Sequence, residues 1–192
     1  GYVERRFHAC FAALEKILPL IEAHAIHLGK KNDAGLRSET IRLGLELRRY
    51  GFRDDLVAGV FALVREVSGR TIGKRHFDVQ LMGGWALLKG MVAEMETGEG
   101  KTLTATLAAS TAALAGVPVH VLTVNDYLTR RDADEMGPVY RALGLSVGCV
   151  VHDVPVNGRR NEYLCDITYC TNKEIVFDYL RDRLTLDEMG GA

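Results

Sequence analysis

The chain has 192 residues, of which 47% are apolar and 26% are charged, and its formal net charge is −1. This length and apolar content suit one domain with a small appendage and argue against two full domains. The charge balance lacks the strong positive excess of a nucleic-acid-binding surface, so we expect no nucleic-acid partner.

The cysteines predict free thiols rather than a disulfide or metal framework. The chain has four of them and no C-x-x-C pair, at Cys10, Cys149, Cys165 and Cys170. The N-terminus has no secretory-signal pattern. We therefore expect a reducing, cytoplasmic location and no zinc site.

Residues 1–69 show only helical periodicity, which predicts an N-terminal helical segment. Two apolar stripes are visible, one of Phe7, Phe11, Leu14, Ile17 and Leu18, and one of Leu36, Leu43 and Leu47. A third helix is expected from Leu56 to Val67. Asp54-Asp55 would cap it and complement its dipole, and Gly69 would end it.

Residues 70–192 alternate between short apolar runs and helical stretches, which predicts an α/β domain with a parallel sheet between two helical layers. The expected strands are Met91 to Met95, Val117 to Val124, Leu145 to Val151 and Ile167 to Cys170. Helices are expected to begin near Lys101, Asp126 and Asn172, with Asn125 as a cap. The uncharged stretch from Thr102 to Val119 is interrupted by Gly116-Val117-Pro118, so it reads as a buried helix and strand.

The run Thr97-Gly98-Glu99-Gly100-Lys101-Thr102 predicts a phosphate-binding loop for ATP or GTP. Gly98 and Gly100 permit the backbone angles that turn successive N–H groups toward a phosphate, at the positive end of the following helix. Lys101 would contact the β- and γ-phosphates, and the Thr102 hydroxyl would bind Mg²⁺. Met95 replaces the first glycine of the full pattern, so a chance glycine-rich turn is the alternative.

A second segment, about twenty residues upstream, offers contacts for a base. Gln80 has both an amide donor and an acceptor for an adenine edge, Phe77 could pack on the ring, and Asp78 could cap a helix. On the residues alone, a surface glutamine and a core phenylalanine remain the alternative.

The order of several strings resembles the SecA family, the motor ATPases of bacterial protein export. They lie between about residues 70 and 183: Arg75 to Gln80, Ala93 to Thr102, Thr123 to Leu128 with Arg131-Asp132, Asp166 to Tyr169, Thr171-Asn172, and Phe177 to Asp182. The resemblance implies a partial P-loop motor domain of RecA/helicase type over 70–192, and the helical stretch ahead of it also looks like the family.

The resemblance implies specific ligands and partners. Phe77 and Gln80 would lie at the adenine, and residues 97–102 would hold the phosphates and Mg²⁺. Asp126 and Arg131 are candidates for coupling this pocket to the polypeptide track. The partners implied are preproteins and a membrane channel, with contact to an anionic membrane surface, and the oligomeric state stays open. The implied location is the cytoplasmic side of the cytoplasmic membrane.

Three departures from the family pattern suggest a divergent or accessory member. Glu96 replaces a usually basic residue, and its carboxylate would weaken phosphate binding if it faced the ligand. Cys170 and Val176 replace residues that are usually glycine.

The acidic pair that hydrolysis requires is also missing from its usual strand end. Asp187-Glu188 follows a helix too closely and Asp134-Glu135 lies within one, so we expect the pair beyond this chain's C-terminal residue. The chain alone would then bind nucleotide at most. A helicase-type ATPase and a degenerate, non-hydrolysing interaction module are the alternatives to a translocation motor.

Overall fold

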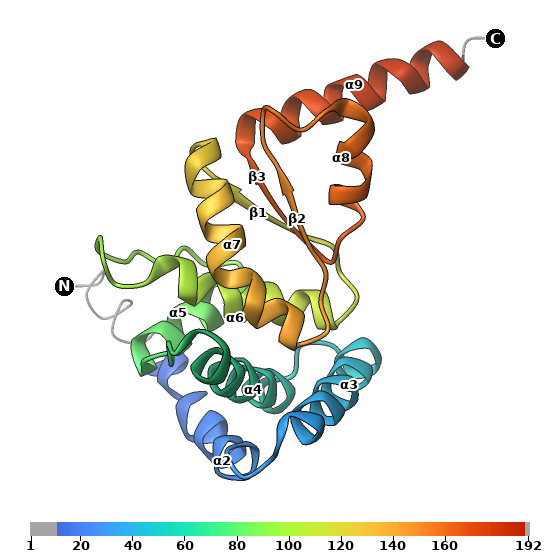
Figure 1. The fold of residues 1–192 in the computed structure, drawn as a ribbon. Helices are drawn as coiled ribbons and strands as arrows, with labels where there is room; N and C mark the ends of the chain where they lie inside the picture. Colours follow the sequence, from blue (N-terminus) through green and yellow to red (C-terminus); the bar gives the residue numbers. More distant parts are fainter. Residues whose placement is uncertain (1–10, 191–192) are drawn as a thin grey trace.

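The centre of the fold is a small parallel sheet, seen in a computed structural model that describes residues 11–190. Its strands are β1 (Val119–Thr123), β2 (Val147–Val150) and β3 (Ile167–Thr171), in the spatial order β1-β3-β2, and both pairings are parallel (Figure 1). Every residue of β3 is buried. A strand buried on both faces is expected in the middle of a parallel sheet covered by helices.

Alternating side chains of β3 contact helices on opposite faces of the sheet. The Tyr169 hydroxyl lies 3.1 Å from that of Tyr140 on α7 (Asp126–Ala142), whereas the Thr168 hydroxyl donates to the carbonyl of Glu162 on α8 (Val156–Tyr163). Helix α6 (Lys101–Leu114) packs with α7 and β1, and α9 (Asn172–Gly190) packs on β3. The three-layer α/β fold predicted from the sequence is therefore confirmed.

Four of the helices that precede α6 pack beneath this sheet. They are α2 (Leu18–Leu28), α3 (Asp33–Tyr50), α4 (Asp54–Ile72) and α5 (Asp78–Leu88) (Figure 1). Helix α4 is central, because it contacts α2 and α3 on one side and α6 and α7 on the other. Its long buried stretch from Leu56 to Val64 explains this position. The N-terminal helices thus dock directly on the sheet-bearing part of the chain, although the division near residue 70 stays a prediction.

The predicted helix starts and the main apolar stripe are confirmed. Helices α6, α7 and α9 begin at Lys101, Asp126 and Asn172. Asn125 caps α7, since its Oδ1 accepts a hydrogen bond of 2.8 Å from the Leu128 N–H. The stripe on α3 is buried as expected, at Leu36, Leu43 and Leu47. The stretch after Thr102 forms a buried helix and then β1, and among the residues described no helix has the length and apolarity to cross a membrane.

The strand predicted from Met91 to Met95 is wrong, because these residues have no strand assignment. Their side chains alternate in burial as a strand's would, and Val92 is 94% exposed. A strand is defined by pairing, however, and within residues 11–190 the sheet contains only β1, β2 and β3. The segment is therefore an extended stretch that leads into the predicted phosphate-binding loop.

The predicted end and N-terminal cap of α4 are also wrong. Helix α4 continues past Gly69 to Ile72, and Gly73 follows it with a left-handed φ of 67°. Asp54 and Asp55 lie in the first turn, where they complement the dipole, but Arg53 holds the capping position and no side chain caps it.

At the N-terminus the apolar stripe is only partly confirmed. Ile17 is 2% exposed but Phe11 is 52% exposed, and Phe7 lies outside the described residues. Cys149, Cys165 and Cys170 are free thiols as expected, while Cys10 also lies outside that range. Within the described part of the chain, no cluster of three or more His, Cys, Asp or Glu residues could hold a metal ion.

Candidate nucleotide-binding site

The loop before α6 has the backbone shape of a phosphate-binding turn. Gly98 and Gly100 have φ values of 93° and 83°, which glycine adopts at low cost and other residues rarely do. A Cβ at Gly100 would also collide with the side-chain amide of Gln80. These two positions therefore require glycine for geometric reasons, one of them because of a contact from another element.

The first turn of α6 presents unused hydrogen-bond donors to this loop. No side chain caps the helix at Gly100. Within residues 11–190, the main-chain N–H groups of Lys101, Thr102 and Leu103 have no protein acceptor. Such groups at a helix N-terminus, with the positive end of the helix dipole, favour a bound anion. The donor set thus fits a phosphate group.

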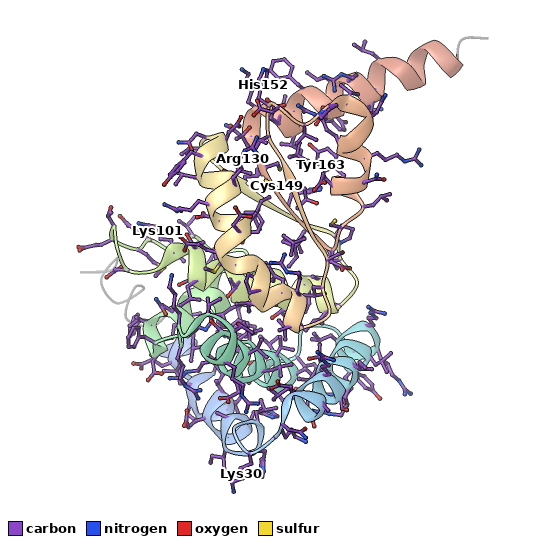
Figure 2. All side chains as sticks on the ribbon, in the orientation of Figure 1. Lys30, Lys101, Arg130, Cys149, His152 and Tyr163 are labelled. Atoms are coloured by element: carbon purple, nitrogen blue, oxygen red, sulfur yellow. The ribbon has the colours of Figure 1, made fainter. Side chains whose placement is uncertain are left out.

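Lys101 and Glu99 make contacts inside the loop. The ammonium of Lys101, labelled at the start of α6 in Figure 2, donates to the Glu96 carbonyl over 2.9 Å. The Glu99 carboxylate accepts a 2.7 Å hydrogen bond from the Glu96 N–H. Glu96 therefore joins the loop through its main chain, and its side chain is exposed. The weakening of phosphate binding by its carboxylate stays a prediction.

Gln80 connects the predicted base-binding segment to the phosphate loop. It is 5% exposed, its Nε2 donates to the Glu99 carbonyl over 2.7 Å, and its Oε1 accepts from the Phe77 N–H over 3.0 Å. The Phe77 ring is 71% exposed and lies at the N-cap of α5. The fold thus brings Gln80 to the loop and leaves the ring open to solvent.

The cap predicted for α5 is wrong. Asp78 is the first residue of the helix rather than its cap, and the side chain of Gln80 satisfies the N-cap amide of Phe77 instead. Asp78 approaches Arg65 of α4, with 3.5 Å between its Oδ1 and the arginine Nη2. A glutamine at the third position of a helix reaches back in this way in a capping box.

Thr102 faces a carboxylate that the sequence analysis did not assign to the site. Its hydroxyl donates to Asp132 Oδ2 on α7 over 3.4 Å. Residues 102 and 132 are thirty positions apart, so no local pattern joins them. The neighbouring Arg131, a predicted coupling residue, donates to the other oxygen of Asp132 over 2.6 and 2.9 Å. Asp126 instead accepts from the His152 N–H, at 3.0 Å, beyond the end of β2.

His76 is a second residue that the sequence analysis missed. It is 1% exposed, and its Nε2 lies 2.9 Å from the Leu103 carbonyl and 3.2 Å from the Thr106 hydroxyl, both on α6. Burial lowers the pKa of His76 to about 4, and the charges of Arg65 and Arg75 act in the same direction. A neutral His76 therefore joins the segment before α5 to the first turns of α6.

Both Asp-Glu pairs lie within helices, as predicted for Asp134-Glu135, whereas Asp187-Glu188 was predicted to follow a helix and instead belongs to one. Asp187-Glu188 is within α9, and Asp134-Glu135 is in the middle of α7. Neither follows a strand, so no described Asp-Glu pair occupies the strand-end position that positions Mg²⁺ and water in phosphoryl transfer.

These features define a class of protein: an α/β domain with a parallel sheet and a glycine-rich loop before a helix. The family model of the SecA DEAD-like domain matches residues 3–190 of this chain. The chain therefore belongs to the SecA family, as its sequence motifs predicted.

The curated relatives carry the same family name. The chain is 55% identical over 173 residues to "Protein translocase subunit SecA 2" of Bordetella avium, covering 90% of this chain and 26% of the relative. It is 56% identical over 157 residues to the SecA 2 of Nitrosospira multiformis, covering 82% and 24%. To "Protein translocase subunit SecA" of Beijerinckia indica it is 54% identical over 164 residues, covering 85% and 17%. The chain thus spans about a quarter or less of these relatives.

Proposed function

We propose that this chain is the ATP-binding part of a motor that couples ATP hydrolysis to the translocation of proteins across the bacterial cytoplasmic membrane. The observation that carries the proposal is the convergence of Gln80 and the unpaired first-turn N–H groups of α6 on one glycine-rich loop. Membership of the SecA family supports the motor role. The motor would act at the cytoplasmic face of the membrane, with preproteins and a protein-conducting channel as partners.

Each site residue has a role in nucleotide binding under this proposal. Gln80 and Phe77 receive the adenine, and the loop from Thr97 to Gly100 surrounds the phosphates. Lys101 exchanges its contact with the Glu96 carbonyl for phosphate oxygens, and Thr102 supplies a hydroxyl ligand. A bound Mg²⁺ would neutralise charge that develops on the phosphates during transfer.

The positions of the Asp-Glu pairs suit nucleotide binding by this chain without hydrolysis. Within the described residues no strand-end carboxylate pair is available to orient water, so we expect this chain by itself to bind nucleotide with little turnover.

A chimera tests the motor role. The matched 173 residues of the Bordetella avium SecA 2 would be replaced by this chain's residues, and ATP hydrolysis would be measured with and without a preprotein and inverted membrane vesicles. We expect preprotein-stimulated hydrolysis that Lys101→Ala abolishes. Stimulation by DNA or RNA instead of preprotein would favour a helicase-type ATPase. Nucleotide binding without any hydrolysis would favour a non-hydrolysing module.

A further inference from the structure

The carboxylate of Asp132 lies between the first turn of helix α6 and the guanidinium of Arg131. Its residue is 8% exposed, and its two oxygens have different partners: Oδ1 accepts two hydrogen bonds from the Arg131 guanidinium, and Oδ2 accepts one from the Thr102 hydroxyl. Burying a carboxylate is costly unless hydrogen bonds and an opposite charge compensate. Arg131 supplies that charge, so Oδ2 is available to Thr102.

Helix α7 holds this carboxylate in a fixed position. The helix begins at the Asn125 cap, seven residues before Asp132, and its buried face packs on α4, α6 and all three strands. The hydroxyl of Tyr140, farther along α7, meets that of Tyr169 on β3 at 3.1 Å, and both rings are fully buried. Asp132 is therefore carried by an element that also contacts the centre of the sheet.

The hydrogen bond from Thr102 to Asp132 affects how the Thr102 hydroxyl could bind a metal ion. The Thr102 hydroxyl has one hydrogen and two lone pairs. When Asp132 accepts the hydrogen, the lone pairs remain available to a cation, and the hydroxyl is held in one orientation. Partners that hydrogen-bond to metal ligands in this way orient them and raise their basicity, and their loss typically reduces metal affinity about 10- to 100-fold.

We propose that Asp132 is a positioning residue for Mg²⁺, which aims the Thr102 hydroxyl at the metal ion of the bound nucleotide from helix α7. The inference rests on the proposed nucleotide binding and adds a carboxylate from outside the loop. Because Asp132 is paired with Arg131, it supplies a hydrogen-bond acceptor without adding net negative charge beside the phosphates.

Mg²⁺-dependent nucleotide binding by the whole chain tests the assignment. A fluorescent ADP analogue would be titrated in EDTA and in Mg²⁺, and Mg²⁺ would then be titrated at fixed analogue. We expect Asp132→Asn to weaken the apparent Mg²⁺ affinity about tenfold or more, while binding in EDTA changes less than about twofold. Asp134→Asn is the matched control, because it removes an exposed carboxylate from the same helix and should change neither value.

A double substitution separates positioning from general damage. Thr102→Val removes the proposed metal ligand itself, so its loss of Mg²⁺ affinity should be at least as large. Adding Asp132→Asn to it should produce no further loss, because Asp132 acts only through the Thr102 hydroxyl. Thermal melts of each variant establish that it is folded. If Asp132→Asn does not fold, Asp132→Ser takes its place, since serine is neutral and too short to reach Thr102.

The outcomes are distinct. Unchanged Mg²⁺ affinity in Asp132→Asn, or equal losses with and without Mg²⁺, overturns the assignment while leaving nucleotide binding intact. Additive losses in the double variant also overturn it. Failure of both the unmodified chain and Glu96→Arg to bind the analogue in either condition contradicts the proposed function itself, and the inference falls with it.

Discussion

The two faces of the sheet bury polar groups in different ways. On the face of α6 and α7, the buried groups near the site include a neutral histidine and a pair of tyrosines, as His76 and the Tyr140–Tyr169 pair show. On the face of α8 and α9, Arg159 lies between Glu174 at 2.6 Å and Asp178 at 2.9 Å, and all three side chains are at most 11% exposed. Tyr163, labelled on α8 in Figure 2, donates to Asp178 as well.

Because of this difference, we expect pH and substitution to change the stability of the two faces in different ways. The α8–α9 face depends on charges that persist at neutral pH, because carboxylates and arginine are ionised there. The face that carries the candidate site also has an ion pair, between Asp132 and the exposed Arg131, but it differs in that it depends on His76 remaining uncharged. Substitution and pH can therefore separate the two faces.

The largest expected effect is on the charged face. Arg159→Met removes the cation that Glu174 and Asp178 share, so we expect the free energy of unfolding at pH 7 to fall by about 3 kcal/mol or more. Urea denaturation measures this loss. Arg160→Met is the matched control, because Arg160 is the exposed neighbour on the same helix and its loss should cost less than about 0.5 kcal/mol. Equal effects of the two substitutions would contradict a structural role for the cluster.

The pH dependence of this cluster has a defined sign. Burial acts to raise the pKa of Asp178, but hydrogen bonds from Arg159 and Tyr163 outweigh it and hold that pKa below its ordinary value. The stabilisation is therefore present above the unfolded-state pKa of about 4 and is lost as the pH falls below it. The penalty of Arg159→Met should shrink in the same range.

A smaller effect in a different pH window is expected from His76. Its folded-state pKa of about 4 lies below the unfolded-state value of about 6.5, so only the unfolded chain gains this proton between those values. Stability should therefore fall with falling pH, by about 2 kcal/mol between pH 7 and 5. His76→Gln should reduce this pH dependence, whereas His120→Gln, at an exposed position of β1, should not. The same slope in both variants would contradict a buried neutral His76.

The smallest expected effect concerns the start of α7, which carries Asp132. Asn125→Ala removes the cap on the Leu128 N–H and should lower the free energy of unfolding by about 1 kcal/mol. Asn125→Ser keeps an oxygen acceptor and should retain most of the stability. Chemical denaturation of the two variants checks this, and an unchanged free energy of unfolding in Asn125→Ala would mean that the cap contributes nothing.

Local signals in the sequence were sufficient for much of the fold. The starts of α6, α7 and α9 and the three paired strands were predicted, because caps, glycines and apolar runs act within a few residues. The strand expected at Met91 to Met95 failed, because pairing depends on a neighbouring strand that a local pattern cannot supply.

The candidate site divides in the same way. The glycines, Lys101 and Thr102 follow a short motif, and the family resemblance pointed to Gln80. Asp132 and His76 carry no such signal, because each contacts α6 from about thirty residues away in the sequence. Asp132 and His76 reach the site only because α7 and the segment before α5 pack on α6.

We propose above all that the loop from Thr97 to Thr102 binds nucleotide phosphates. Titration of this chain with a fluorescent ADP analogue in Mg²⁺ tests it most directly, alongside Lys101→Ala and Glu96→Arg. We expect saturable binding that Lys101→Ala weakens about tenfold or more, since a charged hydrogen-bonding partner of the phosphates is lost. Tighter binding by Glu96→Arg would show that the Glu96 carboxylate acts on the phosphates. Equal binding by the unmodified chain and Lys101→Ala, or no binding even by Glu96→Arg, would contradict the claim.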